Sequence, residues 1–158
     1  MAVTKKTIIV FSGDLDRALA AFIIANGAAA MGDDVTMFFT FWGLNILRRP
    51  AAPPHRKSFL QGMFGRLMPH GPRGLGLSKM NFGGLGARMM RQVMRQQNVT
   101  SLEELIGTAR EQGVKMIACT TSMAVLGFQP DELVDGLEFA GVATYLGEAD
   151  EANVNLFI

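Results

Sequence analysis

Short apolar runs that alternate with amphipathic segments place the strongest constraint on the fold of this chain. Thr7–Phe11 and Val35–Thr40 are continuous apolar and β-branched runs, which are typical of strands buried on both faces of a parallel sheet. Between them, residues 14–31 carry apolar side chains at spacings of three and four, and Gly32 follows as a stop signal. The first forty residues therefore predict a strand–helix–strand unit.

The C-terminal third of the chain shows the same alternation. Ser101 and Glu104 have the spacing of a capping box at the start of a helix that ends at Gly113. Two further strands are predicted at Lys115–Ala118 and Gly141–Leu146, and the stretches expected to be helical are Thr120–Leu126, Gln129–Leu133 and Glu148–Asn153. Strands that alternate with helices predict an α/β fold with three α/β/α layers around a mainly parallel sheet of about five strands.

The middle of the chain, residues 42–97, does not follow this alternation. It holds five of the six prolines and six of the eleven methionines and is rich in glycine, and only Ala87–Gln97 has a convincing helical pattern. We therefore expect one domain over residues 1–158 with a basic, Met- and Gly-rich segment inserted after the second strand. Because this segment has too many methionines and phenylalanines to leave in water, we expect a partly helical cap near the carboxyl edge of the sheet.

Charge is distributed unevenly along a chain whose formal net charge is only +1. No acid occurs between Asp34 and Glu103, and this gap holds ten of the fifteen basic residues. This basic segment has four possible roles, which the sequence leaves open: a subunit contact in a homo-oligomer, a lid, a surface for an acidic partner, or a face that is only solvated. Nucleic acid is not expected as a partner, because aromatic residues suited to base stacking are few.

Cys119 is the one cysteine, and it follows directly on a predicted strand. A lone cysteine excludes an internal disulfide and a Cys₄ zinc site, and the two histidines, His55 and His70, have no second ligand at helical spacing, so no metal is expected. The N–H groups at the start of the next helix favour a thiolate over a thiol. The alternative is a buried cysteine that only fills the core.

Other signals limit the location and the cofactors of the protein. The apolar run after Lys6 is too short for a signal peptide, and no transmembrane segment is long enough, so a cytoplasmic protein is expected. Residues 74–79 resemble a phosphate loop but lack its spacing, and no cofactor is predicted. Ser12, Gly13 and Asp14 form a second strand–helix junction, which either caps the helix or forms a wall of a site at the strand ends.

Four stretches of the chain resemble the DsrE/DsrF/DsrH-like family, in particular its longer DsrE-type branch, and they are 12–18, 40–44, 77–81 and 118–123. The resemblance runs nearly end to end. It implies a flavodoxin-like fold, a homo-oligomer and a role in sulfur trafficking as a sulfur carrier or sulfurtransferase. By this likeness, Cys119 accepts sulfane sulfur as a persulfide. Its donors and acceptors would be other proteins or small thiols.

The candidate site has Cys119 as the reacting group, and whether the protein is an enzyme or a stoichiometric carrier is left open. Residues expected to bind the transferred sulfur or its donor surround it in sequence or by strand order, and they are Ser12, Gly13, Asp14, Phe41, Trp42, Met80, Thr120, Thr121, Ser122 and Met123. Phe41, Trp42, Met80 and Met123 are the candidates for an apolar wall. Two other functions compete with this one: a non-catalytic binding or assembly protein in which Cys119 is structural, and a binder of small anions or nucleotides at the strand ends.

Overall fold

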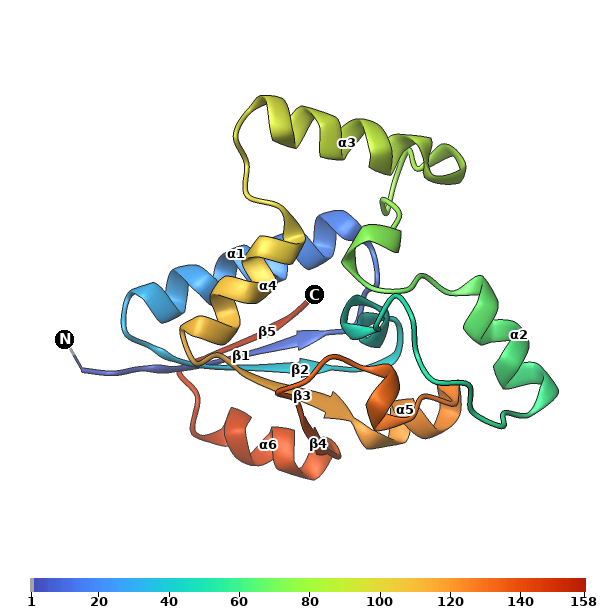
Figure 1. The fold of residues 1–158 in the computed structure, drawn as a ribbon. Helices are drawn as coiled ribbons and strands as arrows, with labels where there is room; N and C mark the ends of the chain where they lie inside the picture. The colour runs from blue at the N-terminus through green and yellow to red at the C-terminus, as the bar shows by residue number, and fades with distance from the viewer. Residues whose placement is uncertain (1) are drawn as a thin grey trace.

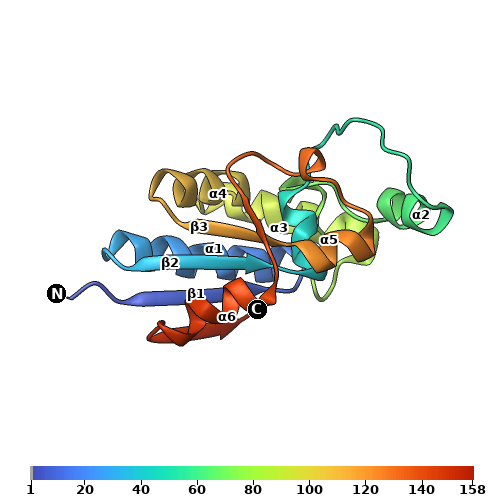
Figure 2. The same cartoon turned by 90° about the horizontal axis from the view of Figure 1, so that it is seen from below.

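A parallel sheet of five strands, in the order β4-β3-β2-β1-β5, forms the centre of the computed structural model, which describes residues 2–158. Its strands are β1 (Lys5–Val10), β2 (Asp34–Phe39), β3 (Lys115–Cys119), β4 (Glu138–Ala140) and β5 (Val154–Phe157). Figure 2 shows β3, β2 and β1 side by side in this order. The predicted three-layer α/β fold and the positions of the first three strands are confirmed.

Helices cover both faces of the sheet (Figure 1). The helices α1 (Leu15–Ala30) and α4 (Leu102–Glu111) pack together on one face, and α6 (Val142–Asp150) lies on the other. The chain steps from β1 through β4 in one direction and then returns to the far side of β1 as β5. Since crossovers between parallel strands are right-handed, a reversal of direction places the returning helix, α6, on the opposite face.

The prediction of a strand at Gly141–Leu146 is wrong, because these residues begin α6. Val142 and Thr144 favour strands locally, but Tyr145 and Ala149 stand four residues apart and both pack against the sheet. Tyr145 packs on Phe38 with ring centroids 5.0 Å apart, and it makes this contact from within the helix α6. The two outer strands were missed in sequence because they are short and largely exposed, which leaves no buried apolar run.

The helix predicted at residues 101–113 is confirmed together with its cap. The Ser101 N–H donates to a Glu104 carboxylate oxygen at 2.9 Å, and the Glu104 N–H donates to the Ser101 hydroxyl at 3.3 Å. The stretch at Gln129–Leu133 is reduced to a single 3₁₀ turn at Pro130–Glu132, preceding β4. The helix after Cys119 is α5 (Thr120–Leu126), as expected.

Between β2 and α4 the chain forms two α-helices and three 3₁₀ helices. They are η1 (Phe41–Leu47), α2 (Phe59–Leu67), η2 (Pro72–Gly74), η3 (Phe82–Gly84) and α3 (Leu85–Gln96). The helix expected at Ala87–Gln97 is α3, whereas α2 was not predicted. Both η1 and α2 contact α5 at the carboxyl end of the sheet, and α3 stands off the layer of α1 and α4 (Figure 1).

The buried Arg48 holds this segment to the rest of the fold. Its guanidinium donates to the carbonyl oxygens of Gly65 and Pro69 at 3.2 and 3.1 Å and lies over the ring of Phe128, 4.7 Å from its centroid. The apolar side chains of the segment are only partly covered by this chain, since Phe59 is 84% exposed and Met80 is 72% exposed. Among residues 2–158, no helix combines the length and the apolar composition that a membrane crossing needs.

Candidate functional site

Cys119 is the last residue of β3, and its side chain points to the α6 face of the sheet. Successive side chains of a strand alternate between faces. Ala118 therefore joins the main core under α1 and α4, while Cys119 joins a smaller cluster on the other face with Phe38, Ile117 and Tyr145. The backbone of Cys119 pairs with Ala140 of β4 and forms the N-cap position of α5.

The thiol is nearly buried. Cys119 lies at the carboxyl end of β3, at the edge of the sheet, but it is only 6% exposed. The residues that follow it, Thr120 and Thr121, are exposed, so the cysteine lies just below the surface at the start of α5. A sulfur atom held here is thus shielded from most of the solvent and lies one residue away from an accessible surface.

A pair of hydroxyl groups stands beside Cys119. Thr40 follows β2, which lies next to β3 in the sheet. Its hydroxyl oxygen lies 2.7 Å from that of Ser122 in α5. Either hydroxyl can donate in this pair, and the proton of the acceptor remains free for another partner. The pair joins the end of β2 to the first turn of α5 and leaves one O–H group free to donate to the thiol.

The pKa of the thiol reflects a competition between burial and these donors. Burial raises the pKa of Cys119, because it disfavours the charged thiolate. The N–H and hydroxyl of Ser122, the N–H of Thr121 and the hydroxyl of Thr40 lower it, and they prevail, so the pKa lies below the ordinary value of a thiol. Thr121 and Ser122 lie in the first turn of α5, whose N-cap residue is Cys119, so the backbone donors are the free N–H groups of that turn, although the thiol itself makes no capping hydrogen bond.

Replacing Ser122 by alanine is expected to slow the reaction of Cys119 with an alkylating reagent at neutral pH. The change removes the hydroxyl that lowers the pKa of the thiol, so the pKa rises and the thiolate fraction falls. The measurement is the alkylation rate as a function of pH, whose midpoint should move upward in Ser122→Ala. Thr120→Ala is the matched control, since Thr120 is exposed and does not contribute to the lowered pKa. Equal pH profiles for all three proteins would contradict the assignment.

The loop Ser12–Gly13–Asp14 follows β1, which is not adjacent to the strand of Cys119, β3. In the sheet, β2 separates β1 from β3, so this loop meets the end of β2 instead. A Cβ atom on Gly13 would stand 2.6 Å from the carbonyl oxygen of Trp42, which shows how tightly the two loops pack. Asp14 is the N-cap residue of α1, but its carboxylate accepts a hydrogen bond from the Ser12 hydroxyl at 3.0 Å and does not cap the helix.

A shallow hollow of about 400 Å³ opens beside this loop. Its lining residues come from the loop after β1, from η1, from α2 and from Gly76 in the loop after η2, and they include Ser12, Gly13, Asp14, Trp42, Phe64 and Leu67. Trp42 is half-exposed here, on the β1 side of Thr40. Of the residues predicted from sequence, this hollow brings Ser12, Gly13, Asp14 and Trp42 together, without Cys119 among its lining residues.

The remaining members of the expected apolar wall are dispersed. Phe41 packs on Phe11, with ring centroids 5.8 Å apart. Met123 is buried in the main core, on the opposite face of the sheet from Cys119. Met80 lies in the exposed loop before α3, where its carbonyl oxygen packs against Gly86. The structure thus gathers Thr121 and Ser122 at Cys119, but not Met80 or Met123.

Three residues at Cys119 were missed from sequence: Thr40, Phe38 and Tyr145. Thr40 carried a usable signal, because it ends a predicted strand and strand ends meet at one edge of a parallel sheet. Phe38 and Tyr145 gave none, because their contact depends on which face α6 covers. Within residues 2–158, no three His, Cys, Asp or Glu side chains lie close enough together to hold a metal ion.

Comparisons with known proteins agree with this architecture. Residues 3–157 match the DsrE/DsrF/DrsH-like family. The chain is 54% identical over 154 residues to the uncharacterized protein YrkE of Bacillus subtilis, covering 98% of this chain and 96% of that protein. It is 37% identical over 158 residues to the sulfur carrier protein DsrE2 of Allochromatium vinosum, covering 98% of both chains.

Solved structures show the same fold at low sequence identity. The ychN protein from E. coli is 11% identical and superposes with a TM-score of 0.58, covering 99% of this chain and 100% of its own. MTH1491 from Methanobacterium thermoautotrophicum, of unknown function, is 15% identical with a TM-score of 0.56, covering 98% of this chain and 99% of its own. With a family match over nearly its whole length and relatives alike from end to end, the chain belongs to the DsrE/DsrF/DrsH-like family.

Proposed function

We propose that this protein is a sulfur carrier that accepts sulfane sulfur on Cys119 as a persulfide and passes it to another thiol. The observation that carries the proposal is the position of Cys119 at the N-cap of α5, beside the paired hydroxyls of Thr40 and Ser122, and these donors lower the pKa of its thiol despite burial. A cysteine that only fills a core is surrounded by apolar groups, which raise the pKa of its thiol, so hydrogen-bond donors around the thiol are not expected there. The name of the DsrE2 relative supports a sulfur-carrying role.

Loading follows from the chemistry of thiolates. The Cys119 thiolate attacks the outer sulfur of a donor persulfide, and a bond forms between its Sγ atom and that sulfur. The bond between the outer sulfur and the donor's own sulfur breaks, and the donor leaves with the electron pair and takes up a proton from water. Unloading repeats this exchange with an acceptor thiolate, which restores the Cys119 thiolate.

The surroundings of Cys119 suit a bound sulfane sulfur. The persulfide is more acidic than the thiol, so its terminal sulfur carries negative charge, and the donors from Thr121, Ser122 and Thr40 stabilise that charge. The cluster of Phe38, Ile117 and Tyr145 excludes water and stray thiols from the inner side. Since Cys119 is the one cysteine of the chain, no internal disulfide can discharge the sulfur, and the acceptor must be a second molecule.

Thiol labelling of the native protein separates this proposal from a structural role for Cys119. A carrier cysteine is expected to react with an alkylating reagent in the folded state, with a pH midpoint below the value of about 8.5 for a free cysteine. A structural cysteine reacts only when the protein unfolds. The control is the same reaction in denaturant, which sets the rate for the exposed thiol. Labelling that occurs only in denaturant would contradict the carrier proposal and support the alternative, a binding or assembly protein in which Cys119 is structural.

A further inference from the structure

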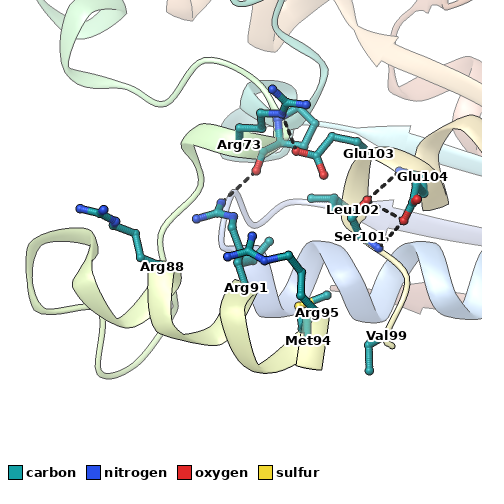
Figure 3. A pocket seen from close by; sticks show the side chains of 12 residues that line it. Arg73, Arg88, Arg91, Met94, Arg95, Val99, Ser101, Leu102, Glu103 and Glu104 are labelled. Carbon is teal, nitrogen blue, oxygen red and sulfur yellow. Dashed lines mark hydrogen bonds and ion pairs between the residues drawn. The ribbon is translucent and has the colours of Figure 1, made fainter. Parts of the chain in front are cut away.

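A cavity of about 580 Å³ lies between α3 and the N-terminal end of α4, away from Cys119 (Figure 3). Its volume is in the range of pockets for small molecules. The cavity borders α1 and α4, which cover the face of the sheet opposite to that of Cys119. Apolar side chains form part of its lining, and they are Leu15, Met94, Val99 and Leu102.

Four arginines line this cavity. Arg88, Arg91 and Arg95 occupy one flank of α3, because their spacings of three and four residues bring them to the same side of the helix. The fourth, Arg73, comes from η2. Figure 3 shows Arg91 and Arg95 next to each other on α3, with Arg88 one turn earlier. Like charges at these spacings repel each other and destabilise the helix, and a bound anion would relieve this repulsion.

The acidic residues of the cavity are already engaged. Glu103 pairs with Arg73, with 3.2 Å between the Oε1 and Nε atoms. Glu104 accepts the N–H and the hydroxyl of Ser101, each at 2.9 Å, in the capping box of α4. The arginine ion pairs among residues 2–158 involve Arg17, Arg49 and Arg73, which leaves Arg88, Arg91 and Arg95 without a carboxylate partner in the described structure.

Arg91 is held in place before any ligand arrives. Its Nη2 atom donates to the carbonyl oxygens of Pro72 and Leu75 at 3.1 and 2.9 Å, and the side chain is half-buried. These two bonds use one end of the guanidinium, and its other N–H groups remain available. A fixed arginine flanked by two exposed ones is suited to a multivalent oxyanion, because guanidinium groups bind phosphate through pairs of parallel hydrogen bonds.

We propose that this cavity binds a phosphorylated organic molecule, with the phosphate groups on Arg88, Arg91 and Arg95 and the organic part against the exposed Val99 side chain. Leu15 and Leu102 are buried in the floor of the cavity, whereas Val99 is exposed, and an organic part would cover Val99 where an inorganic anion would not. The site is separate from the sulfur chemistry proposed for Cys119, since it lies beside α1 and α4, which cover the face of the sheet opposite to that of Cys119. It also differs from a site at the strand ends, because α3 and η2 supply its charge.

Isothermal titration calorimetry at about 150 mM salt tests the proposal, with ATP, FMN and coenzyme A as organic probes and tripolyphosphate as the inorganic comparison. We expect at least one organic probe to bind about tenfold more tightly than tripolyphosphate, because only the organic probes cover the apolar lining. A purely electrostatic surface would prefer tripolyphosphate, which carries a higher charge density. That order of affinities, or the failure of all three organic probes to bind, would overturn the proposal.

Variants localise the binding. The double change Arg88→Gln and Arg95→Gln removes the two arginines that make no ion pair and no tether, and it should weaken the best probe by about tenfold or more. The double change Arg56→Gln and Arg66→Gln is the matched control, because both arginines are exposed, belong to the same acid-free stretch and do not line the cavity. Cys119→Ser should bind the probe as the wild type does. Equal weakening by the two double variants would show a diffuse charge effect and would overturn the assignment to this cavity.

Discussion

Cys119→Ser is expected to abolish sulfur loading completely. After incubation with a sulfane donor such as a low-molecular-weight persulfide, the intact wild-type protein should gain the mass of one sulfur atom, roughly 32 Da, on the peptide that contains Cys119. A serine hydroxyl at this position has no accessible anionic form near neutral pH and forms no stable bond to sulfane sulfur. The added mass should therefore be absent from Cys119→Ser.

The chemistry of the adduct provides the control. A persulfide is lost on addition of excess thiol, whereas sulfinic and sulfonic acids, which also raise the mass, are not. The two oxygens of a sulfinic acid add nearly the same mass as one sulfur, so the thiol treatment is required to assign the shift. The fold should be unaffected, since serine is close in size to the cysteine it replaces and Ser122 and Thr40 stand ready to pair with its hydroxyl. If the wild-type protein gains no thiol-labile sulfur while its thiol remains reactive to alkylation, the carrier proposal fails.

Gly43→Ala should lower the free energy of unfolding by about 3 kcal/mol, the upper part of the range for overpacked sites. A Cβ atom at Gly43 would stand 2.0 Å from the carbonyl oxygen of Val10 and 2.8 Å from its carbon. Neither neighbour is the far end of a flexible side chain, so relief requires the backbone of β1 or η1 to move. The N–H of Gly43 also donates to the carbonyl oxygens of Phe11 and Thr40 at 2.9 and 3.0 Å, and that movement would strain both bonds.

Gly147→Ala is the matched control for this change. Gly147 lies within α6, and a Cβ atom there would meet no atom within 4 Å. Alanine in a helix is favoured over glycine by roughly 0.5–1 kcal/mol, so this variant should be slightly more stable than the wild type. Denaturant unfolding of the three proteins gives both free energies. A Gly43→Ala variant as stable as the wild type would show that η1 does not depend on this close approach.

Gly43→Ala should also slow the reaction of Cys119 in the candidate site. Thr40 immediately precedes η1, and its hydroxyl is one of the groups that lower the pKa of Cys119. A displaced η1 moves this hydroxyl away from Ser122, so any folded Gly43→Ala protein should show a slower thiol reaction at neutral pH. The wild-type pH profile described above is the reference for that measurement.

The sequence by itself determined the central strands, the long helices and the strand–helix junction at Cys119. These features leave local signals, because a strand buried on both faces must be apolar throughout and a helix on a core must repeat its apolar residues every three or four positions. The capping box at Ser101 and Glu104 is equally local, since both partners lie within one turn. Correct placement of β1, β2 and β3 was therefore possible without knowledge of the fold.

Tertiary structure alone decided which residues meet at the thiol. The strand order places β2 beside β3, so Thr40 rather than the Ser12–Asp14 loop stands at Cys119. The same order sends α6 to the thiol's face of the sheet, and there Tyr145 packs as part of a helix in a stretch whose local propensity favours a strand. Strand order and the choice of face arise from contacts between residues far apart in the chain, and such contacts leave no periodic pattern in the sequence. The gathering of arginines from α3 and η2 around one cavity has the same origin, since only the packed fold brings these two segments together.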